Sequence, residues 1–182
     1  MIVSTDEPRG PARSAIDPRE FDPDSYCGLC CGACEILNAY RTSLEAGTPA
    51  SWDDLPAQLR GHIPRAEVVC RGCRTDTVFA GCCGCRVRAC AKARNVAACV
   101  VCAEFPCAEI ERLQGLVDLV KDRLPHSATC FRDRELAQAR GYRAWADAQR
   151  ARWHCPSCGA PFTWYQERCR GCDRPLGPVK GY

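Results

Sequence analysis

Residues 26–34 read YCGLCCGAC, which places four cysteines among nine residues. Cys27 and Cys30 form one CxxC pair, and Cys31 and Cys34 form a second pair directly after it. A CxxC pair is the spacing by which a tight turn presents two thiolates to one metal ion. The stretch therefore predicts a metal centre near the start of the folded chain, and it leaves the kind of metal open.

The composition also indicates metal binding. The chain has 182 residues, of which 18 are cysteines. Its first 25 residues lack the apolar core of a signal peptide, and no apolar run approaches the roughly 18 residues of a membrane span. We therefore expect a cytoplasmic protein, because cysteines stay reduced there and CxxC pairs serve as metal or redox centres. Aliphatic and aromatic residues are few once the cysteines are set aside, so structural metal ions would supply part of the folding free energy.

The most specific motif is HCPSCGAPFTWYQERCRGCDRPLG at residues 154–177, whose cysteines are spaced C-x2-C-x10-C-x2-C. β-prone residues stand between the two pairs. Four thiolates complete a tetrahedral zinc site and leave no position for a substrate, so the motif predicts a structural zinc ribbon. The spacing is also similar to a shortened rubredoxin site, which would hold one redox-active iron. The predicted ligands are Cys155, Cys158, Cys169 and Cys172.

A larger group of cysteines lies between residues 27 and 107 and contains five CxxC pairs, at 27/30, 31/34, 70/73, 82/85 and 99/102. This pairing predicts several metal sites. Proximity in sequence suggests two four-thiolate sites, which are Cys70, Cys73, Cys82 and Cys85, and Cys90, Cys99, Cys102 and Cys107. Cross-braced sites fit the same spacing equally well. In the grouping by proximity, Cys27, Cys31 and Cys34 lack a fourth ligand, for which His62 and His126 are candidates.

The order of these motifs resembles an uncharacterised bacterial and archaeal family of small cysteine-rich domains of unknown function. The resemblance rests on YCGLxCxxC at 26–34, CxGC at 70–73 and CxxCxVRxCAxxxxVxxCxxCxxFPC at 82–107. It implies zinc binding, no assigned reaction, and in some members a C-terminal zinc ribbon. The shared cysteines that it implies are Cys27, Cys31, Cys34, Cys70, Cys73, Cys82, Cys85, Cys90, Cys99, Cys102 and Cys107. Cys30, Cys83 and Cys130 fall outside the pattern, which leaves their roles open.

Iron–sulfur chemistry is the alternative to zinc in the N-terminal cysteines. The spacing Cys27-x3-Cys31-x2-Cys34 is similar to that of radical enzymes that use S-adenosylmethionine, but the sequence shows no strand–helix alternation to build their barrel. Cys30-Cys31-Gly32 resembles the cysteine-rich motif of heterodisulfide reductases, although a second CCG at 82–84 lacks a correctly spaced partner. With three histidines and no phosphate-binding loop or Ser-His-Asp order, the sequence favours a non-enzymatic protein.

Arginines cluster between residues 132 and 174, with Trp153, Trp164 and Tyr165 among them. Arginines and aromatic rings together can bind nucleic acid. Acidic residues are interspersed, and a formal net charge of +3 is small, so a salt-bridged surface is the first interpretation. A protein or nucleic-acid partner is the alternative, and nothing indicates a membrane or a small-molecule substrate.

The sequence thus predicts a small, metal-stapled, mainly α domain with cysteine-rich loops at residues 26–150. A disordered arm at 1–25 precedes it, and a β zinc ribbon at 151–182 follows it. We expect a multi-zinc protein that acts as an interaction or regulatory module.

Helices are predicted at 35–47, with Gly47 as its stop, at 106–124, with Pro106 in its first position, and at about 133–150. Ser51 is a predicted N-cap. The residues expected to face inward from the second helix are Ile110, Leu113, Leu116, Val117, Val120 and Leu124, and from the third Leu136, Ala139, Tyr142, Trp145 and Ala146.

Overall fold

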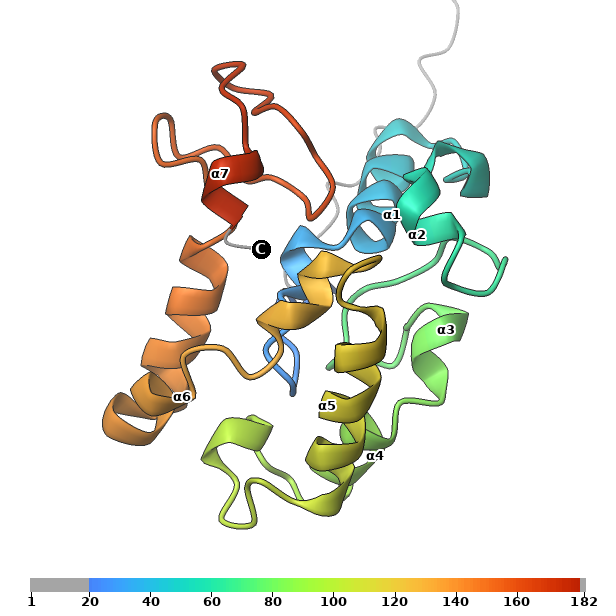
Figure 1. Ribbon diagram of the computed structural model, residues 1–182. Helices are drawn as coiled ribbons and strands as arrows, with labels where there is room; N and C mark the ends of the chain where they lie inside the picture. Colours follow the sequence, from blue (N-terminus) through green and yellow to red (C-terminus); the bar gives the residue numbers. More distant parts are fainter. Residues whose placement is uncertain (1–19, 181–182) are drawn as a thin grey trace, which may run out of the picture.

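The computed structural model describes residues 20–180, and the regular secondary structure in that range is helical (Figure 1). The helices are α1 (Glu35–Ala46), α2 (Ala57–Arg60), α3 (Ala80–Cys83), α4 (Arg86–Ala93), α5 (Ala108–Val120), α6 (Arg134–Ala151) and α7 (Gly177–Lys180). The 3-10 turns between them are η2 (Cys31–Ala33), η3 (Trp52–Asp54), η4 (Cys99–Val101) and η5 (Pro125–Thr129). Within residues 20–180, no helix is both long and apolar enough to cross a membrane.

The prediction of a β zinc ribbon is wrong for residues 151–180, the described part of that segment. No β-strand forms there, and only two isolated bridges are present, His154 with Pro161 and Arg168 with Pro175. Two backbone hydrogen bonds flank each bridge, so the pairing is complete but short. Between the bridges, the N–H groups of Trp164 and Tyr165 donate to the Ala33 carbonyl and the Glu35 carboxylate, so they are not available to extend the pairing into a ribbon. The mainly helical part of the prediction agrees with the structure.

Helix α1 follows its local sequence signals. It ends at Ala46, and Gly47 adopts a left-handed conformation (φ 67°) while its N–H donates to the carbonyl of Ser43. Ser51 caps η3, because its hydroxyl accepts a hydrogen bond from the N–H of Asp53 at 3.2 Å. Both predicted boundaries are confirmed.

Helix α5 is shorter than predicted. Cys107 has extended backbone angles (φ −118°, ψ 171°) and is the N-cap, so Pro106 precedes the helix instead of opening it. Ile110 and Val117 are buried, as expected, but 46% of Leu116 is exposed. The buried face of α5 is therefore narrower than the face predicted from the sequence.

Helix α6 is broken at Gly141, whose backbone angles (φ 81°, ψ 176°) are not helical. Because the break interrupts the helical periodicity, the predicted row of inward-facing residues does not continue from one half of the helix to the other. Trp145 and Ala146 are buried as predicted, but Ala139 is exposed and Ala137 is buried in its place. The Trp145 indole N–H donates to the carbonyl of Arg132 at 2.8 Å.

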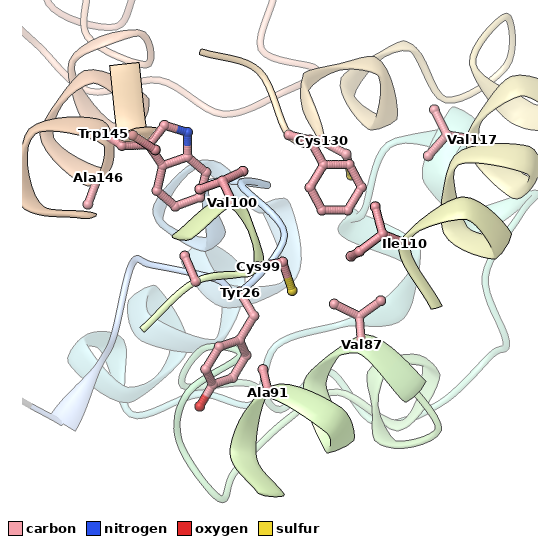
Figure 2. Packing of buried hydrophobic residues seen from close by; sticks show 13 residues of the cluster. Tyr26, Val87, Ala91, Cys99, Val100, Ile110, Val117, Cys130, Trp145 and Ala146 are labelled. Atoms are coloured by element: carbon pink, nitrogen blue, oxygen red, sulfur yellow. The ribbon is translucent and has the colours of Figure 1, made fainter. Parts of the chain in front are cut away.

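The buried residues form three clusters. Figure 2 shows the largest, here called the central cluster. It comprises Tyr26, Val87, Ala91, Ala98, Cys99, Val100, Ile110, Val117, Cys130, Phe131, Ala137, Trp145 and Ala146. The C-terminal cluster comprises Cys30, Ala33, Trp153, Cys155, Phe162, Trp164, Cys169 and Leu176. The α1 cluster comprises Ile36, Leu55, Leu59, Val68, Cys70 and Phe79.

Residues 20–25 pack against the domain. Phe21 is buried, and the Asp22 N–H donates to the carbonyl of Arg71 at 2.8 Å. Asp24 accepts hydrogen bonds from Arg150 at 2.9 Å and from the Tyr142 hydroxyl at 2.8 Å. The remainder of the predicted arm, residues 1–19, lies outside the described residues.

Gly72 of the CxGC motif allows this packing. Its φ is +118°, and a Cβ atom placed on it would lie 2.0 Å from the carbonyl oxygen of Asp22. Only a residue without a side chain fits here.

We expect Gly72→Ala to lower the free energy of unfolding by about 2–4 kcal/mol, because the methyl group clashes with the backbone at a strained φ. Chemical denaturation measures the change. The matched control is Gly115→Ala on the exposed side of α5, where a Cβ meets nothing within 4 Å. Alanine is favoured over glycine inside a helix, so this control should gain up to about 1 kcal/mol. Equal stability of the two variants would contradict the close approach at Gly72.

Candidate metal centre

The four cysteines of the C-terminal motif converge on one point. The Sγ atoms of Cys155, Cys158, Cys169 and Cys172 all lie within 4.8 Å of one another. Two of the Sγ–Sγ distances are 3.7 Å (Cys155 to Cys172) and 3.5 Å (Cys158 to Cys169). Sulfurs bonded to a tetrahedral zinc ion at about 2.3 Å would be about 3.8 Å apart. This group, here called the C-terminal quartet, therefore has the geometry of a site for one tetrahedral ion.

The quartet is built from two similar turns. The residue after each pair has a positive φ, +72° at Gly159 and +57° at Asp173. The N–H of Gly159 donates to the carbonyl of Cys155, and the N–H of Asp173 donates to that of Cys169, both at 2.8 Å. Glycine and aspartate are among the residues that adopt this conformation most readily. The two turns thus present their sulfurs in the same way.

Backbone amides in these turns point at the sulfurs. The N–H of Ser157 lowers the pKa of the Cys155 thiol to about 6. The N–H of Gly171 donates to the Cys169 sulfur at 3.4 Å. Amide donors stabilise thiolates, which are the form that binds metal. The donor set is purely thiolate and suits zinc or iron, so it fits the predicted ion without identifying it.

The N-terminal cysteines are arranged differently. All 18 cysteines of the chain are free thiols. Within residues 20–180, the C-terminal quartet is the only group of three or more Cys, His, Asp or Glu residues whose ligand atoms all lie within 4.8 Å of one another. The eleven predicted N-terminal ligands are therefore not at the mutual distances of a single-ion site, and their role as ligands stays a prediction.

Two thiol pairs connect segments far apart in the sequence. The Cys31 thiol hydrogen bonds to Cys73, which lowers the pKa of Cys73. The Cys130 thiol hydrogen bonds to Cys27, and this contact lowers the pKa of Cys27 to about 6. Cys27 and Cys31 thus face cysteines from other segments, an arrangement closer to cross-bracing than to grouping by sequence proximity.

Sequence reasoning missed the place of Cys130 beside Cys27. No spacing rule points to it, because the nearest cysteine before it is Cys107. The backbone reinforces the approach, since the N–H of Phe131 donates to the carbonyl of Cys27 at 2.8 Å.

Other predicted ligands lie near the α1 cluster. Cys70 belongs to this cluster, and Cys34 packs against it. Burial, the Glu35 carboxylate and the Cys70 thiolate raise the pKa of Cys34 well above its ordinary value. Desolvation, followed by the charges of Cys70, Cys73 and Cys85, raises the pKa of Cys82 to about 12. These thiols are therefore near enough to repel one another when ionised.

Two of the cysteines outside the family pattern, Cys30 and Cys83, lie in opposite environments. Cys30 is buried in the C-terminal cluster, and burial raises its pKa to about 11. Cys83 is exposed, and its thiol donates to the carbonyl of Phe79 at 3.7 Å.

The histidines hydrogen bond elsewhere. His126 Nδ1 lies 2.7 Å from the Tyr165 hydroxyl, and its ring stacks on Trp164 with centroids 4.0 Å apart. His62 Nδ1 lies 2.8 Å from the carbonyl of Gln58, and His154 Nδ1 lies 2.8 Å from that of Arg150. In the described part of the chain, none of the three joins a group of three or more ligand atoms at metal-site distances.

Several of the late arginines form intramolecular ion pairs. Arg168 pairs with Asp173 at 2.8 Å, and Arg134 pairs with Glu135 at 2.9 Å. Arg152 pairs with Asp133. These ion pairs agree with the first interpretation of the arginine cluster, a salt-bridged surface.

Comparison with family models gave a match to "Protein of unknown function (DUF3795)" over residues 24–112. The matched segment contains all eleven cysteines of the shared motifs, and the C-terminal quartet lies beyond it. Comparisons with curated proteins and with solved structures gave no match. The family resemblance inferred from the order of the motifs is confirmed, because residues 24–112 match the model of this family of proteins of unknown function.

Proposed function

We propose that the protein binds zinc and that its C-terminal quartet holds one zinc ion as a structural centre. The observation that carries the proposal is the convergence of four Sγ atoms within 4.8 Å of one another. A zinc ion bound by four thiolates has no open position for a substrate, so such a centre stabilises the fold instead of catalysing a reaction. When bound, the metal would contribute folding free energy to residues 152–180, the described end of the chain, where no strand and only the short helix α7 form.

The centre would hold the C-terminal segment against the family domain. The N–H of Trp164 donates to the carbonyl of Ala33 at 3.0 Å, and the N–H of Tyr165 donates to the Glu35 carboxylate at 2.6 Å. Trp164 lies between the two cysteine pairs in sequence. A metal that fixes those pairs thus also fixes the residues that contact η2 and the start of α1.

A non-enzymatic role as an interaction or regulatory module is the wider proposal, and the closed thiolate centre supports it. A cytoplasmic location is proposed with it, because 18 free cysteines suit a reducing compartment. The alternative is an iron–sulfur electron-transfer protein, which would contain iron and acid-labile sulfide and would be brown, whereas a zinc protein is colourless.

The first test is the metal content of the protein purified without oxygen. We expect the double variant Cys158→Ser/Cys172→Ser to lose one zinc ion per chain, measured by elemental analysis. Both residues are exposed, which limits damage to the core. The matched control, Cys83→Ser, changes an exposed cysteine outside the quartet and should keep the full zinc content. An unchanged zinc content in the double variant would overturn the proposal, and iron lost in place of zinc would favour the redox alternative.

Metal removal should loosen the C-terminal segment specifically. In chelated protein we expect faster amide hydrogen exchange at residues 155–173, because the two turns lose the ion that joins them. Mass spectrometry of peptides from this segment measures the change, and peptides from α6 serve as the reference. Identical exchange in the metal-bound and chelated proteins would rule out a structural role for the ion.

The packing of His126 predicts an acid-sensitive contact. His126 is 6% exposed, and burial lowers its pKa to about 4. An unfolded histidine has a pKa of about 6.5, so protons bind the unfolded chain preferentially between these values. The stabilising effect of this group is complete above pH 6.5 and is lost as the pH falls toward 4, a change of about 3 kcal/mol.

An NMR titration of the His126 ring protons should therefore give a pKa of about 4. Acid also protonates metal-binding thiols, so His126→Gln is the matched control. The difference in unfolding free energy between the native protein and this variant should shrink on acidification. A measured pKa of 6 or above would show that the ring is not buried against Trp164.

A further inference from the structure

A second group of four thiols shares one pocket. Cys90 lies on α4, Cys99 and Cys102 lie at the two ends of η4, and Cys107 is the N-cap of α5. All four line a small pocket between these elements. No other cysteine lines it, so three separate segments bring these four sulfurs to a common space.

The walls of the pocket are mainly apolar. Val87, Ala91 and Ile110 line it and belong to the central cluster, and Figure 2 shows the Cys99 side chain beside Val87 and Ile110. Apolar surroundings exclude water and leave the sulfurs as the groups able to bind a cation in the pocket.

The charged residues at the pocket are paired with one another. Arg94 pairs with Glu104, and Glu109 pairs with Arg86 and, at 3.4 Å, with Arg112. The two carboxylates are therefore engaged by guanidinium groups, and Arg94 also hydrogen bonds to the Cys90 sulfur at the edge of the pocket.

The backbone holds the cysteine positions in place. The Cys102 N–H donates to the carbonyl of Cys99 at 3.0 Å, which closes the η4 turn. The Cys99 N–H donates to the carbonyl of Tyr26 at 2.9 Å and ties that turn to the YCGLCCGAC stretch. Thiolates gathered in an apolar pocket need a cation to offset their repulsion.

We propose that Cys90, Cys99, Cys102 and Cys107 hold a second thiolate metal centre, separate from the C-terminal quartet. The inference extends the proposed metal-binding function to the family domain and does not depend on occupancy of the first centre. Its occupant is a thiophilic metal, either one zinc ion or one iron–sulfur cluster, since four cysteines serve both. The sulfurs are more widely spaced than those of the quartet, so binding one zinc ion requires their side chains to turn inward.

The test compares the metal and acid-labile sulfide content of full-length variants purified without oxygen. Cys90→Ser/Cys102→Ser removes two half-buried ligands from different segments. We expect this variant to lose one zinc ion per chain, or alternatively all of its iron, its sulfide and its visible absorption. The matched control Cys83→Ser should retain the full content.

The two centres can be told apart in the same experiment. If Cys90→Ser/Cys102→Ser keeps the complete metal content, the second centre is disproved while the first can still stand. If Cys158→Ser/Cys172→Ser keeps it, the proposed function fails while the second centre can still stand.

A measurement on the unaltered protein keeps the proposal testable should the variant fail to fold. N-ethylmaleimide labelling followed by peptide mass spectrometry reports which thiols are free. We expect Cys90, Cys102 and Cys107 to be protected together until a strong chelator is added, and the exposed Cys83 to react in both states. Rapid labelling of Cys90 and Cys102 before chelation would overturn the second centre.

Discussion

The backbone of the YCGLCCGAC stretch receives hydrogen bonds from three distant parts of the chain. Its carbonyls at Tyr26, Cys27 and Ala33 accept from the N–H groups of Cys99, Phe131 and Trp164, at 2.9, 2.8 and 3.0 Å. The same nine residues supply side chains to the central and C-terminal clusters and pack on the α1 cluster through Cys34. Each cluster is small by itself, so the fold depends on this stretch to join them.

This dependence explains why residues outside the family match are part of the same core. Cys130, Trp145 and Trp164 all lie beyond residue 112, yet they pack in clusters that contain residues of the matched segment. A chain with three small clusters in place of one large core gains little from hydrophobic burial alone. Thiolate centres would supply the missing stability, because metal binding free energy is folding free energy when the site forms only in the folded state. Cysteine therefore serves in this chain both as a core residue and as a predicted ligand.

Local signals in the sequence predicted local structure correctly. The end of α1 at Gly47, the Ser51 cap and the convergence of the C-terminal quartet all follow from residues within a few positions or from CxxC spacing. The errors arose where distant contacts or one residue override a pattern. Trp164 and Tyr165 donate their N–H groups to Ala33 and Glu35 instead of extending the two bridges, and Gly141 breaks α6, where Ala139 is exposed. The contact between Cys27 and Cys130 spans most of the described chain, and no local pattern encodes it.

The surroundings of the cysteines, more than their number, decide what each can do. Cys30 is buried in the C-terminal cluster and Cys83 is exposed, and both fall outside the family pattern of cysteines. The sequence left Cys27, Cys31 and Cys34 without a fourth partner, and histidine was the candidate. The structure turns His126 toward Trp164 and places Cys130 beside Cys27. With Cys130 included, the thiols outside the quartet and the second pocket, Cys30 and Cys83 aside, are eight: Cys27, Cys31, Cys34, Cys70, Cys73, Cys82, Cys85 and Cys130. Eight is the number that two further four-thiolate centres would require, and the observed Cys27–Cys130 and Cys31–Cys73 contacts would make such centres cross-braced.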